Sequence, residues 1–151
     1  MSYKGKFSPK NPNKYNGNPI NIIYRSLLER RFMVYLDDSL SVLKWSSEEI
    51  IIPYVSPVDN RVHRYFPDFY MKYRNKNGVI VEELIEVKPF SQCSPPNPKK
   101  SKTKTGRTSK RYLKEVQTYL VNEAKWKQAM SYCDDRNYVW RILTEKDINI
   151  Y

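Results

Sequence analysis

The chain has 151 residues, of which 40% are hydrophobic and 28% charged, and its formal net charge is +11. This length predicts one folded domain, and no apolar run is long enough for a membrane span, so we expect a soluble protein without a standard secretion signal. Two cysteines and one histidine argue against a disulfide framework and most histidine-based metal sites. The positive charge favours nucleic acid over an acidic protein or a membrane as the partner.

The N-terminal segment, residues 1–19, contains four lysines and no acidic residue, among several Asn, Pro and Gly residues. This composition predicts an extended or partly disordered basic arm that lies along a phosphate backbone or docks on a partner. The remaining residues, 20–151, are expected to form a single domain.

Residues 21–37 have the apolar spacing of a helix, with a stripe of large side chains on one side. Arg25 and Glu29 fall inside this stripe. Charges on a core-facing side are costly unless they are paired or bind a metal. Either the two side chains form an ion pair at the edge of the core, or Glu29 belongs to a functional site.

β-Strands are expected next. Residues 42–54 predict one or two strands, and residues 62–72 and 79–88 predict a β-hairpin, because a turn ending in Asn77-Gly78 separates them. Strands after a first helix indicate an α/β or α+β sheet flanked by helices.

A long basic loop is predicted for residues 89–108, which contain four prolines and no acidic residue. Its position after the last hairpin strand favours contact with DNA over a nuclear localisation signal. The cationic residues that we expect to bind DNA here are Lys99, Lys100, Lys102, Lys104 and Arg107, followed by Lys110.

Helical spacing returns at residues 109–134, where Ser109 could cap the helix and Leu113, Val116, Leu120 and Ala124 form one stripe. Lys125 on this helix is either a phosphate contact or a solvated lysine. Residues 138–143 predict a short strand, and residues 145–148 predict a last helical turn capped by Thr144.

The candidate catalytic residues lie at the ends of the two hairpin strands. Glu86 and Lys88 share one face of their strand, and the hairpin brings Asp68 beside them. Two carboxylates suit Mg²⁺, with the Val87 carbonyl as a further ligand, and their repulsion favours a bound cation. Lys88 would hold or deprotonate a water molecule and steady the phosphate, while Glu29 would hold a second metal or order metal-bound water.

Each of these elements is common alone, but their order is not. Tyr24 to Glu29, Pro67-Asp68-Phe69 and Ile85 to Lys88 together resemble the PD-(D/E)xK nuclease superfamily, which includes type II restriction enzymes. The closest resemblance is to phage junction-resolving endonucleases and to the endonuclease subunit of Tn7-type transposases. The chain as a whole also resembles the head-completion nucleases of T-even bacteriophages.

The resemblance implies a restriction-endonuclease-like α/β (α+β) fold with a mixed central sheet flanked by helices. It implies Mg²⁺-dependent hydrolysis of DNA phosphodiesters, with Mn²⁺ as a substitute, and catalytic roles for Glu29, Asp68, Glu86 and Lys88. Arg25 and Ser26 match the motif before the helix glutamate and are expected to contact DNA.

The expected partners are double-stranded DNA and phage portal or head-vertex proteins, in the cytoplasm of the infected host or in the virion, with no membrane and no small-molecule cofactor. Two alternatives stay open: a branched-DNA resolvase or transposase-type strand cleaver, and a head-completion structural protein that binds DNA without cutting it. The preferred DNA structure, the oligomeric state and the number of metals also stay open.

Overall fold

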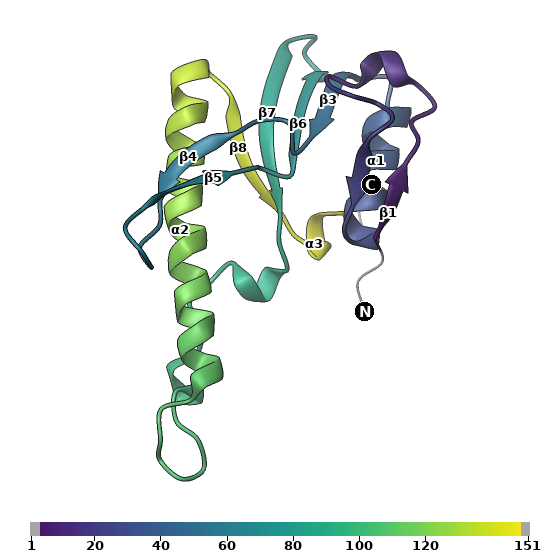
Figure 1. Ribbon diagram of the computed structural model, residues 1–151. Coiled ribbons are helices and arrows are strands. Elements are labelled where there is room, and N and C mark those ends of the chain that lie inside the picture. Colours follow the sequence, from purple (N-terminus) through teal and green to yellow (C-terminus); the bar gives the residue numbers. More distant parts are fainter. Residues whose placement is uncertain (1–3, 149–151) are drawn as a thin grey trace.

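The computed structural model describes residues 4–148, and a mixed four-stranded sheet lies at its centre (Figure 1). The strand order is β3-β6-β7-β8, with bounds Val42–Ser47, Phe69–Arg74, Ile80–Val87 and Val139–Leu143. β6 pairs antiparallel with β3 and β7, whereas β8 joins β7 in parallel. The predicted mixed sheet flanked by helices is therefore confirmed.

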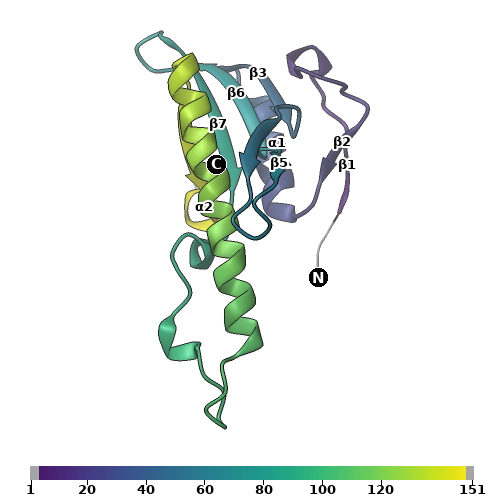
Figure 2. The same cartoon turned by 60° about the vertical axis from the view of Figure 1, so that its left-hand side comes forward.

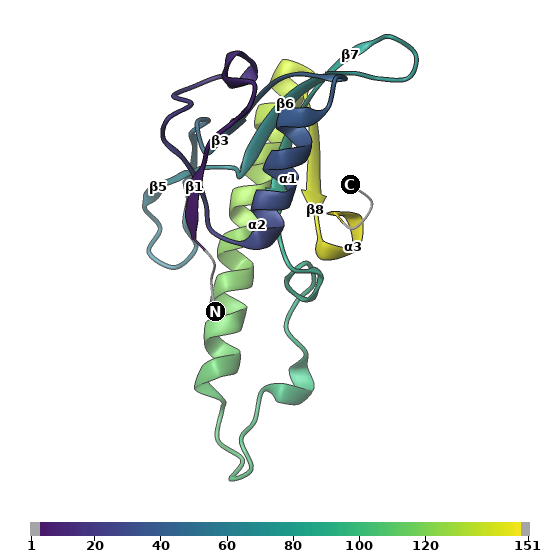
Figure 3. The same ribbon diagram turned by 90° about the vertical axis from the view of Figure 1, so that its right-hand side faces the viewer.

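Two helices cover opposite faces of this sheet (Figure 3). Side chains alternate along a strand, so β7 contributes Ile85 to the core under α1 (Leu27–Asp38) and Leu84 to the core under α2 (Lys110–Arg136). A last helical turn, α3 (Glu145–Ile148), follows β8 as predicted, and the Thr144 hydroxyl at its start accepts a hydrogen bond from the Lys146 amide. Within residues 4–148, none of the helices has the length and apolarity that crossing a membrane requires.

The predicted hairpin is confirmed for β6 and β7, but the segment before it behaves differently. Residues 62–72 do not form one strand: β5 (Val62–Tyr65) ends before Pro67, which lacks the N–H that a sheet requires. β5 pairs instead with β4 (Ile52–Val55) in a separate antiparallel ribbon that packs on α2 (Figure 1).

The N-terminal segment is not a disordered arm over its described part, residues 4–19. β1 (Gly5–Phe7) pairs with β2 (Ile22–Tyr24), so the helix predicted from residue 21 begins only at Leu27. Two aromatic side chains anchor the segment: the rings of Phe7 and Tyr15 lie edge-on to the buried Trp45, with centroids 5.9 and 4.8 Å away.

The second predicted helix is confirmed, and Ser109 caps it by accepting a hydrogen bond from the Tyr112 amide. Its predicted core stripe is wrong for Leu113 and Leu120, which are about half exposed, whereas Ala124 packs against the core. The buried residues of α2 are Asn122, Trp126, Ala129 and Cys133. The reason is visible in Figure 2, where the N-terminal half of α2 extends well beyond the sheet together with the loop before it.

Candidate active site

Two carboxyl groups meet at one end of the sheet. The register that pairs Phe69 with Ile85 places Asp68, just before β6, opposite Glu86 on β7. The Val87 amide donates a hydrogen bond of 2.8 Å to Asp68 Oδ2. Glu86 is only 6% exposed, on the face of the sheet that α2 covers. The predicted proximity of these residues is thus present in the fold.

Both oxygens of Glu86 have partners. The Tyr65 hydroxyl donates a hydrogen bond of 2.5 Å to Oε2, and the Lys88 ammonium lies 3.4 Å from Oε1. Tyr65 is buried at the end of β5, so the β4–β5 ribbon fixes the orientation of Glu86. Lys88 follows β7 directly and shares the strand face of Glu86, as predicted.

Burial and the neighbouring carboxylates both disfavour the ionised form of these acids. Burial raises the pKa of Asp68 well above its ordinary value, the nearby Glu86 and Glu29 raise it further, and the hydrogen bond from the Val87 amide opposes the shift. The pKa of Glu29 is also raised, first by burial and then by neighbouring carboxylates that include Glu86. A site with these properties favours a bound cation.

Glu29 reaches this end of the sheet from the first turn of α1. Ser26 is the N-cap of that helix and accepts a hydrogen bond of 3.1 Å from the Glu29 amide. Glu29 Oε2 in turn accepts one of 3.1 Å from the Arg25 amide. This arrangement resembles a capping box and holds the glutamate where the helix starts. Ser26 therefore has a clear structural role, while DNA contact by Ser26 stays a prediction.

The Arg25 side chain does not form the ion pair with Glu29 that was one of the two interpretations of the sequence. Its guanidinium group donates two hydrogen bonds, of 3.1 and 3.0 Å, to the carboxylate of Glu48. Glu48 has a φ of 53°, which is uncommon for a residue with a long side chain, and its amide donates to the Asp68 carbonyl. Arg25 thus lies beside the acids but is held by a residue that the motif did not reveal.

Lys125 faces the acids from α2, one helical turn before the buried Ala129. Its ammonium group lies 5.8 and 5.6 Å from the ring centroids of Tyr54 and Tyr65. Burial lowers its pKa, and the carboxylates of Glu86 and Asp68 oppose that shift. Lys125 is therefore a half-buried cation within the field of the acids, and not a solvated helix lysine.

The donor set fits a hard divalent cation. Among residues 4–148, no three Asp, Glu, His or Cys side chains are grouped to hold an ion by themselves. Magnesium typically takes one or two protein carboxylates and completes its shell with water and phosphate oxygens. Asp68, Glu86 and the Val87 carbonyl match that requirement, with Glu29 outside the immediate pair.

The cations of the basic loop lie elsewhere. Figure 1 shows residues 99–110 at the free end of α2, away from the end of β7 where Glu86 lies. The structure therefore does not bring these six predicted DNA-binding residues (Lys99, Lys100, Lys102, Lys104, Arg107 and Lys110) to the acids. Any contact that they make with DNA would be remote from the reacting bond.

Tyr65 and Glu48 are the two site residues that the sequence did not reveal as such. The Tyr65 hydroxyl reaches Glu86 because β5 pairs with β4 outside the main sheet, and local spacing does not show that contact. The only signal for Glu48 was an acidic pair directly after the strand that contains Trp45.

Residues 39–145 match the family model described as TnsA-like endonuclease N terminal, a span that includes Asp68, Glu86 and Lys88. The chain belongs to this family. It is also 40% identical, over 145 residues, to the head completion nuclease of Enterobacteria phage T4, and the alignment covers 96% of this chain and 93% of the phage protein. The predicted family, fold class and endonuclease class of this TnsA-like chain are confirmed.

Proposed function

We propose that this chain is a divalent-metal-dependent DNA endonuclease that cleaves DNA during phage head completion in the infected host cell. The observation that carries the proposal is the joint position of Asp68, Glu86 and Lys88, two carboxyl groups and an ammonium on adjacent strand ends. The name of the T4 relative and the family match support the same activity.

In this proposal, Asp68, Glu86 and the Val87 carbonyl hold Mg²⁺, and Mn²⁺ can substitute for it. When bound, the cation lowers the pKa of a coordinated water molecule and neutralises charge on the scissile phosphate. Lys88, 3.4 Å from Glu86, orients the attacking water and stabilises the charge that develops on the phosphoryl oxygens. Tyr65 keeps Glu86 in one orientation, since its hydroxyl occupies the oxygen that Lys88 does not face.

Further cations would hold the DNA. Lys125 contacts a phosphate next to the scissile one, because it is the cation that α2 directs towards the acids. Arg25 binds a phosphate on the α1 side after exchanging its Glu48 partner for the DNA. Glu29 orders water around the metal or binds a second ion. Head-vertex or portal proteins would bring this endonuclease to packaged DNA.

The test is a cleavage assay on plasmid, Y-shaped and four-way-junction DNA with Mg²⁺, Mn²⁺ or EDTA. We expect cleavage with either metal, none with EDTA, and a loss of about 10²- to 10³-fold in rate for Lys88→Ala. A wild-type protein that binds DNA but cuts none of these substrates with either metal would overturn the enzymatic proposal and support a structural role.

A further inference from the structure

One face of α2 changes from apolar to polar side chains where the helix extends beyond the sheet. Side chains three or four positions apart lie on the same side of a helix. Over the sheet, this face consists of the buried Ala129 and Cys133. Continued towards the N-terminus, the same face carries only polar and cationic side chains, which are Arg111, Lys114, Thr118, Asn122 and Lys125. The projecting half of α2 is therefore suited to a polyanion.

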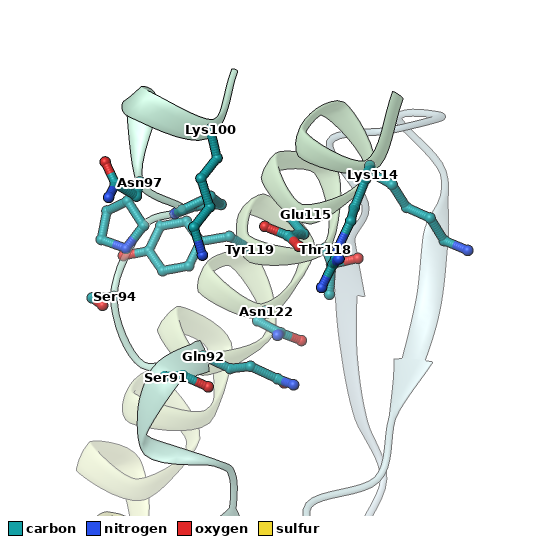
Figure 4. A pocket seen from close by; sticks show the side chains of 13 residues that line it. Ser91, Gln92, Ser94, Asn97, Lys100, Lys114, Glu115, Thr118, Tyr119 and Asn122 are labelled. Atoms are coloured by element: carbon teal, nitrogen blue, oxygen red, sulfur yellow. Dashed lines mark hydrogen bonds and ion pairs between the residues drawn. The ribbon is translucent and has the colours of Figure 1, made fainter. Parts of the chain in front are cut away.

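A pocket of about 710 Å³ lies between this face and the loop that follows β7. In Figure 4, Gln92 and Lys100 extend from the loop into the space in front of α2. The helix contributes the ring of Tyr119 and the amide of Asn122. The one acidic lining residue, Glu115, is held by Arg111 in an exposed ion pair of 3.2 Å.

On both of its walls the pocket begins a few residues along the chain from the active site. The loop wall begins at Ser91, three residues after Lys88. The helix wall ends at Asn122, which precedes Lys125 by one helical turn. A DNA strand whose scissile phosphate lies at Asp68 and Glu86 could thus run past Lys88 and Lys125 into the pocket.

The chemistry of the lining fits a nucleotide. Lys100 and Lys114 can bind phosphate, Tyr119 offers a flat ring for stacking, and the amides of Gln92 and Asn122 can pair with base edges. The volume lies within the ~300–1,000 Å³ typical of sites for one small molecule, which is too small for a duplex. Stacking on a side chain also requires a base that is not paired in a helix.

We propose that this pocket binds an unpaired nucleotide of the cleaved DNA, beyond the scissile phosphate on the side of the projecting half of α2. The enzyme would then act preferentially where a duplex ends or forks and one strand is free to enter between the loop and α2. This inference rests on the proposed nuclease function and adds the substrate class to it.

Binding of fluorescent duplexes tests the inference, in EDTA so that no cleavage occurs. Blunt duplexes are compared with duplexes that carry a short single-stranded 5′ or 3′ tail, for wild type, Tyr119→Ala and Tyr119→Phe. We expect a tail of one polarity to tighten wild-type binding, and Tyr119→Ala to weaken tailed binding about tenfold with blunt binding unchanged. Tyr119→Phe keeps the ring and should retain the wild-type preference.

Tyr112→Ala is the matched control, because Tyr112 lies on the same projecting part of α2 but does not line the pocket. If Tyr119→Ala does not fold, Lys114→Ala tests the same helix wall of the pocket, with Lys127→Ala as its control. We expect Lys114→Ala to lose the preference for tailed duplexes and Lys127→Ala to keep it. A wild type that binds both duplexes equally, or variants of Tyr119 and Lys114 that keep the preference, would overturn this inference. Metal-dependent plasmid cleavage by the same protein would still uphold the proposed function.

Discussion

At the scale of single residues, the ionised carboxylate of Asp68 destabilises the folded state of the metal-free protein. Its carboxyl group is half-buried beside Glu86, and burial and the neighbouring carboxylate both raise its pKa in the folded state. The folded protein therefore keeps a proton that the unfolded chain releases as the pH rises above about 3.9. The free energy of unfolding falls through that window, up to the raised pKa of the folded state.

Asp68→Asn should consequently raise the melting temperature of the metal-free protein at pH 8, since the neutral amide can still accept the hydrogen bond from Val87. The gain should shrink towards pH 4, where Asp68 is protonated in the wild type. Thermal unfolding in EDTA measures both. A variant that melts lower than wild type at both pH values would show that the carboxylate is not destabilising.

Asp68, Glu86 and Lys88 could be located from the sequence because one hairpin brings them together, and hairpin register follows from local spacing. Tyr65 could not, since its approach to Glu86 depends on β5 pairing with β4 and packing on α2. The pairing of Arg25 with Glu48 is similarly a contact between separate elements.

At the scale of elements, the two halves of α2 have different structural roles. Its C-terminal half completes the core through Trp126 and Cys133, whereas its N-terminal half projects with the basic loop. Spacing alone predicted an apolar stripe through Leu113 and Leu120, because periodicity indicates a helix but does not show where its partner sheet ends.

The projecting basic loop should contribute to DNA affinity through counterion release. Replacing Lys99, Lys100, Lys102 and Lys104 with alanine should weaken binding and flatten the dependence of log K on log salt by up to about 3–4 units. A titration of duplex binding against salt concentration measures this slope. The pair Lys76→Ala and Lys127→Ala, two exposed lysines outside the loop, should leave it nearly unchanged. A slope equal to that of wild type in the quadruple variant would exclude the loop from DNA binding.

At the scale of the whole molecule, residues 4–19 pack against the rest of the domain and do not form a separate arm. The Lys, Asn, Pro and Gly residues of this segment predicted an extended or partly disordered arm, but Phe7 and Tyr15 pack on Trp45 in the core. The Tyr15 hydroxyl also donates to the Ser47 carbonyl and accepts from the Ser47 amide. The amino-acid composition of a segment does not show whether its few aromatic side chains pack into the core.

Tyr15→Ala should therefore lower the free energy of unfolding by about 3 kcal/mol or more, as large aromatic truncations in cores do. Ile20→Ala, in the same part of the chain but at a side chain that is 81% exposed, should change it little. Urea unfolding followed by tryptophan fluorescence measures both variants. Equal, small effects would restore the interpretation of this segment as an independent arm.

The central claim, that the acids at the end of the sheet catalyse DNA cleavage, is tested most directly by two glutamate variants on one strand. Glu86→Gln keeps the shape of the side chain but removes its charge from the site. Glu82→Gln does the same on the same strand face, where the carboxylate accepts a hydrogen bond from the Tyr70 hydroxyl. In single-turnover cleavage with Mg²⁺, Glu86→Gln should be slower than wild type by at least about 10²-fold and Glu82→Gln nearly as fast as wild type. Equal rates for Glu86→Gln and wild type would contradict the assignment of the active site.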